Sequence, residues 1–354
     1  IPQWLDADQT IPSDDVDWVD EIMQTAQIQS YNVSLAKGDS KSQQMFSLGY
    51  FNQEGLIKYT GFERYSARFN SSYNIGDFLT IGENFTANYK EQVSVGTNAA
   101  LGSVILTAMQ FPSIVPVKDI NGAYAGNPIN DSNNPMGQLS RNKDNKQKRV
   151  QALGNVFANL YVGDFTFKTS FGLDYQNYNI RSFSPTYDEI LSTNNTNSLS
   201  TSNSFNYQFS FTNTLNYKKQ FGKHHLDAIL GQESIEYNYE GFSASVSEFL
   251  YEDLNFRYLS FGTENMLNSG SANGWSLNSY FGRVNYNFDE KYLFTATVRR
   301  DGSSRFSEDN RWGTFPAFSL GWRLNREDFF NPDGAISSLM LRGSWGQTGN
   351  QEIS

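Results

Sequence analysis

Long stretches of this sequence alternate apolar and polar side chains with a period of two. Between residues 63 and 74, Tyr65, Phe69 and Tyr73 share one parity, and Arg64 and Arg68 share the other. Successive side chains of a β-strand point to opposite faces, so this period predicts strands with one apolar and one polar face. About twelve such strands are predicted, at residues 31–37, 43–51, 63–74, 79–90, 149–162, 165–178, 204–217, 225–238, 276–288, 291–301, 313–325 and 338–346.

The links between the predicted strands alternate strictly between short and long. The short links are 38–42, 75–78, 163–164, 218–224, 289–290 and the longer 326–337, and the long links are 52–62, 91–148, 179–203, 239–275 and 302–312. A soluble β-sandwich or β-helix explains the alternation of side chains, but it does not explain why every long link falls at one end. Outer-membrane barrels have short periplasmic turns, long extracellular loops, an apolar outer band and a polar lumen. The pattern therefore predicts an all-β fold in which these strands form part of an antiparallel transmembrane β-barrel.

The composition excludes several other kinds of protein. Aromatic residues make up 15% of the 354 residues, the net charge is −10, and there is no cysteine. The lack of cysteine excludes disulfides and thiolate metal sites, and the acidic balance argues against nucleic acid as the main ligand. No apolar run approaches the roughly 18 residues of a transmembrane helix. The chain begins at Ile1 rather than Met and ends soon after a strand-like segment, so we expect it to be part of a longer protein.

Five blocks of the sequence resemble the SusC/RagA-like group of TonB-dependent outer-membrane transporters of Bacteroidetes. The similarity begins near residue 17, runs to the end of the chain and weakens in the long links. The last three blocks are highly specific in combination. The blocks are DWVDEIMQTAQIQSYNVSLAKGD (17–39), GYFNQEGLIKYTGFERYSAR (49–68), YFGRVNYNFDEKYLFTATVRRDGSSRF (280–306), NRWGTFPAFSLGWR (310–323) and LRGSWGQTGNQEI (341–353).

The resemblance implies a barrel of about 22 strands with an N-terminal plug inside it and a SusD-like surface lipoprotein as a lid. It implies import of oligosaccharides or oligopeptides across the outer membrane of a Gram-negative bacterium, driven by the TonB–ExbB–ExbD complex and the proton gradient. The resemblance also allows a dimer of two barrel–lid pairs. In this interpretation residues 1–30 belong to an extracellular loop, and residues 31–354 form barrel strands with long extracellular loops at 91–148, 179–203 and 239–275. The plug and the later strands lie outside this chain.

Two other functions remain open alongside active transport. One is a structural or adhesive outer-membrane barrel without a plug, and the other is a soluble glycan-binding β-protein. The sequence contains no P-loop, nucleophile elbow or dinucleotide fingerprint. We therefore expect a transporter rather than an enzyme, with no cofactor.

The stretch TVRRDGSSRF (297–306) is expected at the extracellular end of a strand. Asp301-Gly302 is predicted to open the loop there. Asp301 and Arg305 are predicted either to form a local salt bridge or to contact substrate.

Four arginines lie at polar-face positions of four successive predicted strands: Arg283, Arg299, Arg323 and Arg342. An unpaired charge in a narrow lumen is costly, so partners are expected. We predict that these arginines pair with acidic groups of the plug or of neighbouring strands; separate solvation in a wide lumen is the alternative.

The long loops are the expected place for substrate selection, because rigid scaffolds commonly carry function on loops. Tyr124, Tyr187 and Trp275 are candidates for stacking on sugar rings, with ordinary loop packing as the alternative. The apolar segment 99–118 predicts a short helix that ends at Pro112. A loop Ca²⁺ site would draw on oxygens such as those of Asp119, Asn121, Asn127 and Asp131, but their spacing is not that of an EF-hand.

Overall fold

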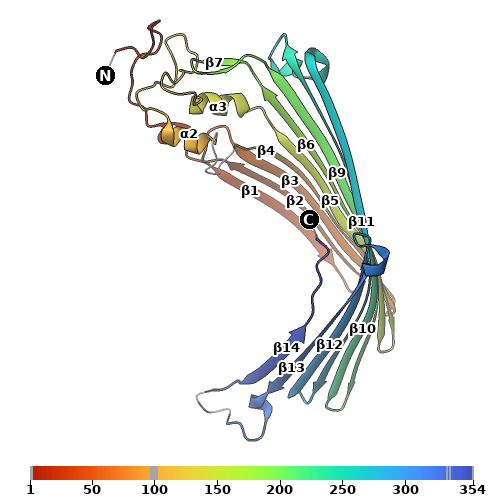
Figure 1. The fold of residues 1–354 in the computed structure, drawn as a ribbon. Helices are drawn as coiled ribbons and strands as arrows, with labels where there is room; N and C mark the ends of the chain where they lie inside the picture. The colour runs from red at the N-terminus through yellow and green to blue at the C-terminus, as the bar shows by residue number, and fades with distance from the viewer. Residues whose placement is uncertain (1–2, 96–102, 332–333, 335, 353–354) are drawn as a thin grey trace.

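The computed structural model describes residues 3–95, 103–331, 334 and 336–352, and its main feature is one curved antiparallel sheet (Figure 1). The sheet has 12 strands, in which every strand pairs with its neighbour in chain order, apart from a small hairpin that is inserted in one loop. None of the described helices is long and apolar enough to cross a bilayer. The predicted set of twelve strands is therefore confirmed.

The strands of the main sheet are β1 (Ile28–Gly38), β2 (Ser42–Glu54), β3 (Gly61–Ile75), β4 (Leu79–Val93), β5 (Gln147–Val162), β6 (Phe165–Ser184), β9 (Ser198–Phe221), β10 (His224–Phe249), β11 (Gly262–Phe288), β12 (Tyr292–Ser303), β13 (Trp312–Arg323) and β14 (Met340–Gly346). The inserted hairpin is β7 (Tyr187–Glu189) and β8 (Ser192–Asn194). The helices are α1 (Trp18–Ile22), α2 (Val104–Gln110) and α3 (Pro135–Asn142), with short 3₁₀ turns η1 (Leu254–Phe256), η2 (Leu259–Phe261), η3 (Glu308–Asn310) and η4 (Leu324–Arg326).

Several strands extend well beyond their predicted ends on the side of the long links. Most of the expected loop 239–275 is strand, because β10 runs to Phe249 and β11 begins at Gly262. The expected loop 179–203 is likewise reduced by β6 and β9. These extensions are rich in Ser, Asn and Gly on both faces, so a hydrophobic period cannot reveal them. Their pairing rests on the backbone hydrogen bonds of the ladder and on a small buried cluster of Phe183, Leu199, Val246 and Phe249.

The two faces of the sheet differ in chemistry along most of its length. The face that carries Tyr65, Phe69 and Tyr73 is called here the apolar face, and the face that carries Arg64 and Arg68 is called the polar face. At the loop side, Tyr31, Tyr50, Tyr65 and Tyr89 stand directly opposite one another on β1–β4 and form one row on the apolar face. Their neighbouring rings lie 5.1–6.4 Å apart. Such a row of tyrosines is typical of a membrane–water interface.

A second aromatic band lies on the apolar face at the side of the short turns. Tyr292 stacks between Phe288 and Trp322, at centroid distances of 6.3 and 6.4 Å. On β3, Tyr65 lies in the first band and Tyr73 lies eight positions further along, near the short turn. Eight positions correspond to about 26 Å of strand. That length fits the apolar band of an outer-membrane barrel.

Glu327, in the turn after β13, ties this second band together. Its carboxylate accepts hydrogen bonds from the Tyr292 hydroxyl (2.7 Å), the Trp322 indole (3.0 Å) and Lys291 (3.1 Å). These donors, Tyr292 first, lower the pKa of the Glu327 carboxyl to about 2.

The main hydrophobic core of the chain lies outside the sheet. The loop subdomain, defined here as residues 3–27 and 103–142, packs around Trp18, whose indole donates to the carbonyl of Pro112 at 3.1 Å. Trp18 meets Phe111 edge-on with ring centroids 4.8 Å apart. Figure 1 shows α2 and α3 at the same end of the sheet as β7. The buried apolar residues are Ile11, Trp18, Ile22, Ile57, Val104, Ala108, Phe111, Val115, Ala125, Met136 and Leu139.

The loop subdomain modifies two expectations. The helix expected in segment 99–118 is α2, which ends just before Pro112, and residues 99–102 lie outside the described residues. The loop expected to extend to residue 30 ends earlier, because β1 begins at Ile28. Residues 3–27 pack against the hydrophobic core.

Candidate functional site

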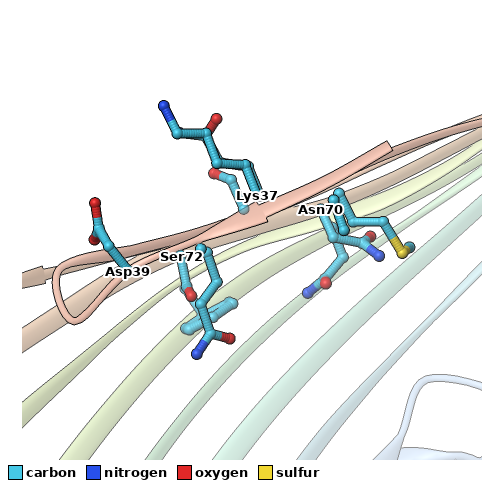
Figure 2. A pocket seen from close by; sticks show the side chains of 12 residues that line it. Lys37, Asp39, Asn70 and Ser72 are labelled. Atoms are coloured by element: carbon cyan, nitrogen blue, oxygen red, sulfur yellow. The ribbon is translucent and has the colours of Figure 1, made fainter. Parts of the chain in front are cut away.

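A hollow of about 670 Å³ lies beside the turn that joins β1 and β2. Figure 2 shows Lys37 and Asp39 on one side of the strands, and Asn70 and Ser72 on the other. Because these side chains do not converge on one volume, the hollow is the open edge of the sheet rather than a binding site.

The polar face holds a compact ionic cluster around Arg299 of β12. The guanidinium donates to Asp301 on the same strand (2.7 Å), to Glu233 of β10 (3.1 Å) and to the Ser279 hydroxyl of β11 (2.8 Å). Ser279 is fully buried, and the guanidinium lies 5.6 Å from the ring of Phe281. Charge-assisted hydrogen bonds of this kind are the strong ones. Two acids and one cation therefore lie within one hydrogen-bonded cluster that links three strands.

The other three arginines of the predicted set lie on the same face without acidic partners in the described part of the chain. Arg283 stands opposite Thr297, and Arg342 stands opposite Gly321. Arg323 donates to the backbone carbonyl of Glu290 at 3.4 Å. Among the described contacts of the four arginines, Arg299 alone has acidic partners, and these lie on its own strand and on β10, two strands away.

The predicted local salt bridge between Asp301 and Arg305 is wrong. Asp301 lies inside β12, opposite Gly313, and binds Arg299. Arg305 instead pairs with Glu352 at 3.2 Å. The strand continues to Ser303 and not only to Asp301-Gly302, because the pairing with β13 extends to Trp312.

Trp275 lies in β11 rather than in a loop. Its ring stacks on Tyr237 of β10 with centroids 5.6 Å apart, and the Arg305 guanidinium lies 5.3 Å from its centroid. Both rings belong to the polar face, since Tyr237 and Trp275 are directly opposite in the ladder. The pair forms an aromatic surface on the face that also carries Arg299.

Tyr187 and Tyr124 lie near a buried ion pair that the sequence did not reveal. Glu189 of β7 accepts from Arg141 of α3 at 2.6 Å and from the backbone N–H of Asn134 at 2.7 Å. The Arg141 guanidinium lies 3.8 Å from the Tyr187 ring, and Tyr124 contacts Lys118 through its ring face at 5.0 Å. Tyr187 and Tyr124 are therefore engaged in packing within the loops.

The Glu189 pair joins the β6–β9 loop to the loop subdomain. Burial raises the pKa of the Glu189 carboxyl, and the bonds from Arg141 and Asn134 oppose that shift. Asn134 caps α3 through its side chain, which accepts from Met136 and Gly137 at 3.1 Å. Glu189 thus joins the β6–β9 loop to α3 and to the residue that caps it.

The loop oxygens considered for Ca²⁺ do not converge. Asp119 accepts backbone N–H groups of Asn121 and Ala123, and the side-chain oxygen of Asn127 accepts from Ile129. In the described ranges no group of three or more His, Asp or Glu side chains is arranged to hold a metal ion.

One constellation on the polar face did not emerge from the sequence. Arg64, Lys90 and Arg149 are directly opposite one another on β3, β4 and β5. Lys90 and Arg149 are separated by a loop of more than 50 residues, so their alignment depends on the strand register. The alignment could be found from the sequence only by pairing β4 with β5 residue by residue, using the alternation on each strand to fix the register.

Comparison with known proteins agrees with this architecture. Residues 108–351 match the family model described as TonB dependent receptor-like, beta-barrel. The chain is 31% identical to the TonB-dependent receptor P3 of Formosa agariphila, over 96% of this chain and 34% of that protein. It is 30% identical to the TonB-dependent receptor SusC of Bacteroides thetaiotaomicron, over 95% of this chain and 35% of that protein.

A solved structure is similar as well. The RagAB peptide transporter superposes with a TM-score of 0.82 at 27% identity, over 96% of this chain and 39% of that chain. The chain therefore spans about a third of the length of the curated relatives that it matches. The family match covers well over half of the chain, and the strand order, the polar lumen-like face and the aromatic bands agree with it. The chain belongs to the β-barrel family of TonB-dependent receptors.

Proposed function

We propose that the protein containing this chain imports oligosaccharides or oligopeptides across the outer membrane, energised by TonB. The observation that carries the proposal is the similarity to SusC and to the RagAB peptide transporter over almost the whole chain. Family members are outer-membrane transporters rather than enzymes. The polar face of the sheet would line the lumen, and a SusD-like lipoprotein would cover its mouth.

The unpaired arginines support a role for the plug in this mechanism. Arg283 and Arg342 present charges on the polar face with no acidic partner among the described residues. An unpaired charge in a narrow channel is costly, so acidic groups of the plug are the natural partners. Changing either arginine to Glu should then impair the seating of the plug, and a barrel without a seated plug should admit antibiotics. Variants that transport normally and still exclude antibiotics would contradict the proposed contact with the plug.

The proposed function is tested with the full-length protein, tagged and extracted from outer membranes in mild detergent. Co-purification of a lipoprotein in about equal amount, together with uptake that stops when TonB is deleted, is the expected result. A barrel that purifies alone and shows no TonB dependence would instead favour a structural or adhesive barrel. Recovery from the soluble fraction would favour a glycan-binding β-protein.

A further inference from the structure

Three cations lie side by side on the polar face, near the loop-side end of the sheet. Arg64, Lys90 and Arg149, called here the cationic row, occupy directly opposite positions on three adjacent strands. Opposite residues of an antiparallel pair have Cβ atoms about 5 Å apart, and like charges in that arrangement are destabilising. The row therefore raises the free energy of the folded chain unless an anion binds there.

No acidic side chain of the described residues neutralises this row. Glu63 and Glu91 are close in sequence, but they alternate to the apolar face. There Glu63 accepts from the hydroxyls of Tyr50 and Tyr65, and Glu91 binds Lys146. On the polar face of β1–β6 the cations are Arg64, Arg68, Lys90, Arg149 and Lys168, against Asp174 alone among the described strand residues.

The hydrogen-bonding capacity of the row is largely unused. Lys90 makes no hydrogen bond or ion pair within the described chain. Arg149 donates to Gln176 and lies 4.5 Å from the Tyr178 ring, but its Nε is buried without a partner. Arg64 lies 5.5 Å from the ring of Phe51. Flat rings thus border the row on both sides, while most of its N–H donors remain available.

The side chains around the row are suited to bind the neutral, hydroxyl-bearing part of a ligand. The neighbouring positions on the loop side are Gln53, Phe62 and Gln92, which line a cavity of about 430 Å³. The neighbouring positions on the other side are Ser66, Asn88, Gln151 and Gln176. Amides and hydroxyls donate and accept hydrogen bonds, so this wall suits sugar hydroxyls, and aromatic rings suit the apolar face of a sugar ring.

The position of the row along its strands indicates at which stage of import it would contact cargo. Each of its residues lies within three positions of the loop-side end of its strand, directly behind the row of interfacial tyrosines. A cargo that enters from the loop side meets these cations early. This position favours cargo over the plug as the source of the missing anion.

We propose that the cationic row binds carboxylate or sulfate groups of an acidic oligosaccharide during import. The proposal rests on the proposed transport function and narrows its substrate class. Arginine guanidinium groups match the two oxygens of carboxylate or sulfate in a fork, whereas Lys90 contributes a point charge. The rings of Phe51 and Tyr178 and the surrounding amides hold the sugar backbone.

The test uses the full-length protein purified in detergent with its native partners, and measures binding by calorimetry. The probes are oligogalacturonate, a sulfated chondroitin oligosaccharide, a neutral cello-oligosaccharide of equal length and an oligoglutamate peptide. The variant is Arg149→Gln, and Arg149→Lys retains the charge. Lys148→Gln is the matched control, since it removes a cation one residue away on the opposite face, where Lys148 lies 3.8 Å from Glu91.

The expected result is tighter binding of the two acidic oligosaccharides than of the neutral one, with binding that weakens as salt is added. Arg149→Gln should weaken the acidic ligands roughly tenfold and leave the neutral one unchanged, while Arg149→Lys retains part of the affinity and Lys148→Gln matches wild type. Equal affinity for neutral and acidic oligosaccharides overturns the inference while transport stands. Preference for the peptide overturns the choice of oligosaccharide.

Two further outcomes also have fixed meanings. An Arg149→Gln barrel that assembles but admits antibiotics shows that the row contacts the plug, which overturns the proposal. Failure of wild-type protein to bind or import any of the probes counts against the proposed function itself. A variant that does not assemble is replaced by Lys90→Gln, which removes a charge that forms no hydrogen bond or ion pair in the described chain.

Discussion

The Arg299 cluster and the cationic row lie on the same face of one sheet, yet their charges are handled in opposite ways. Around Arg299, two acids approach one guanidinium within 3.1 Å and a buried serine completes the set. Around Arg149, the neighbours across the ladder are another cation and a tyrosine. The first arrangement is satisfied within the folded chain. The second has no acidic partner among the described residues, and on our proposal this difference separates a structural charge cluster from one that binds an anion.

The largest effect is expected from Arg299→Met. This change leaves Glu233 and Asp301 near each other without their cation, so unfolding should become easier by about 2–3 kcal/mol. The measurement is the denaturant midpoint of the folded barrel, followed by its heat-dependent mobility on gels. Arg300→Met is the control, because Arg300 lies on the apolar face, where its guanidinium lies 5.3 Å from the Trp312 ring and forms no ion pair among the described residues. Equal losses in the two variants would show that the cluster has no special role.

The next largest effect is expected from giving the cationic row an acidic neighbour like the one that Arg299 has. Asp301 lies two residues after Arg299, and Gln151 lies two residues after Arg149 on the same face. Gln151→Glu should therefore supply the cationic row with an internal partner and weaken acidic oligosaccharide binding roughly tenfold. Calorimetry against Gln151→Asn tests this. Undiminished binding would mean that the anion contacts the row from elsewhere.

A smaller effect of opposite sign is expected from Lys90→Gln. Removing the middle charge relieves repulsion from Arg64 and Arg149, so the ligand-free barrel should gain about 0.5 kcal/mol of stability. The denaturant midpoint measures this gain at low salt, and added salt should erase it. A loss of stability would indicate that Lys90 already has an anionic partner in the complete protein.

The smallest effect concerns Glu327, a carboxylate satisfied by neutral donors and one lysine. Its folded-state pKa of about 2 lies below the ordinary 4.5, so its contribution to stability is present above pH 4.5 and is lost as the pH falls towards 2. Glu327→Gln should flatten the pH dependence in that window. Denaturant midpoints at several pH values compare it with wild type, and identical profiles would contradict the assignment.

The sheet was largely predictable, because alternation of side chains and alternation of link lengths are both local signals. Twelve strands follow from residues such as Tyr65, Phe69 and Tyr73, which must share a face to meet lipid. The strand ends were not predictable. The outer part of β11 is mostly polar, with sequence TENMLNSGSANG before Trp275, so alternation does not show that Trp275 stands opposite Tyr237 in the ladder.

The charge clusters depended on information that single strands do not contain. Sequence parity placed Arg299 on the polar face, but its partner Glu233 lies 66 residues away on β10. Proximity in sequence suggested that Arg305 binds Asp301, whereas β12 continues through Asp301 and Arg305 turns towards Glu352. Register across long loops decides these contacts, and it is set by the ladder as a whole.

The strands β10 and β11 are much longer than a membrane crossing requires. About 10 residues suffice to cross the apolar part of a membrane, yet β10 has 26 residues and β11 has 27. Gln232 of β10 stands opposite Tyr280, whose ring stacks on Trp312 on the apolar face. Phe249 lies 17 residues further along β10, which is roughly 55 Å of strand. On the proposed transport function, this hairpin extends far beyond the bilayer, so that cargo binding at its tip would be held well away from the membrane.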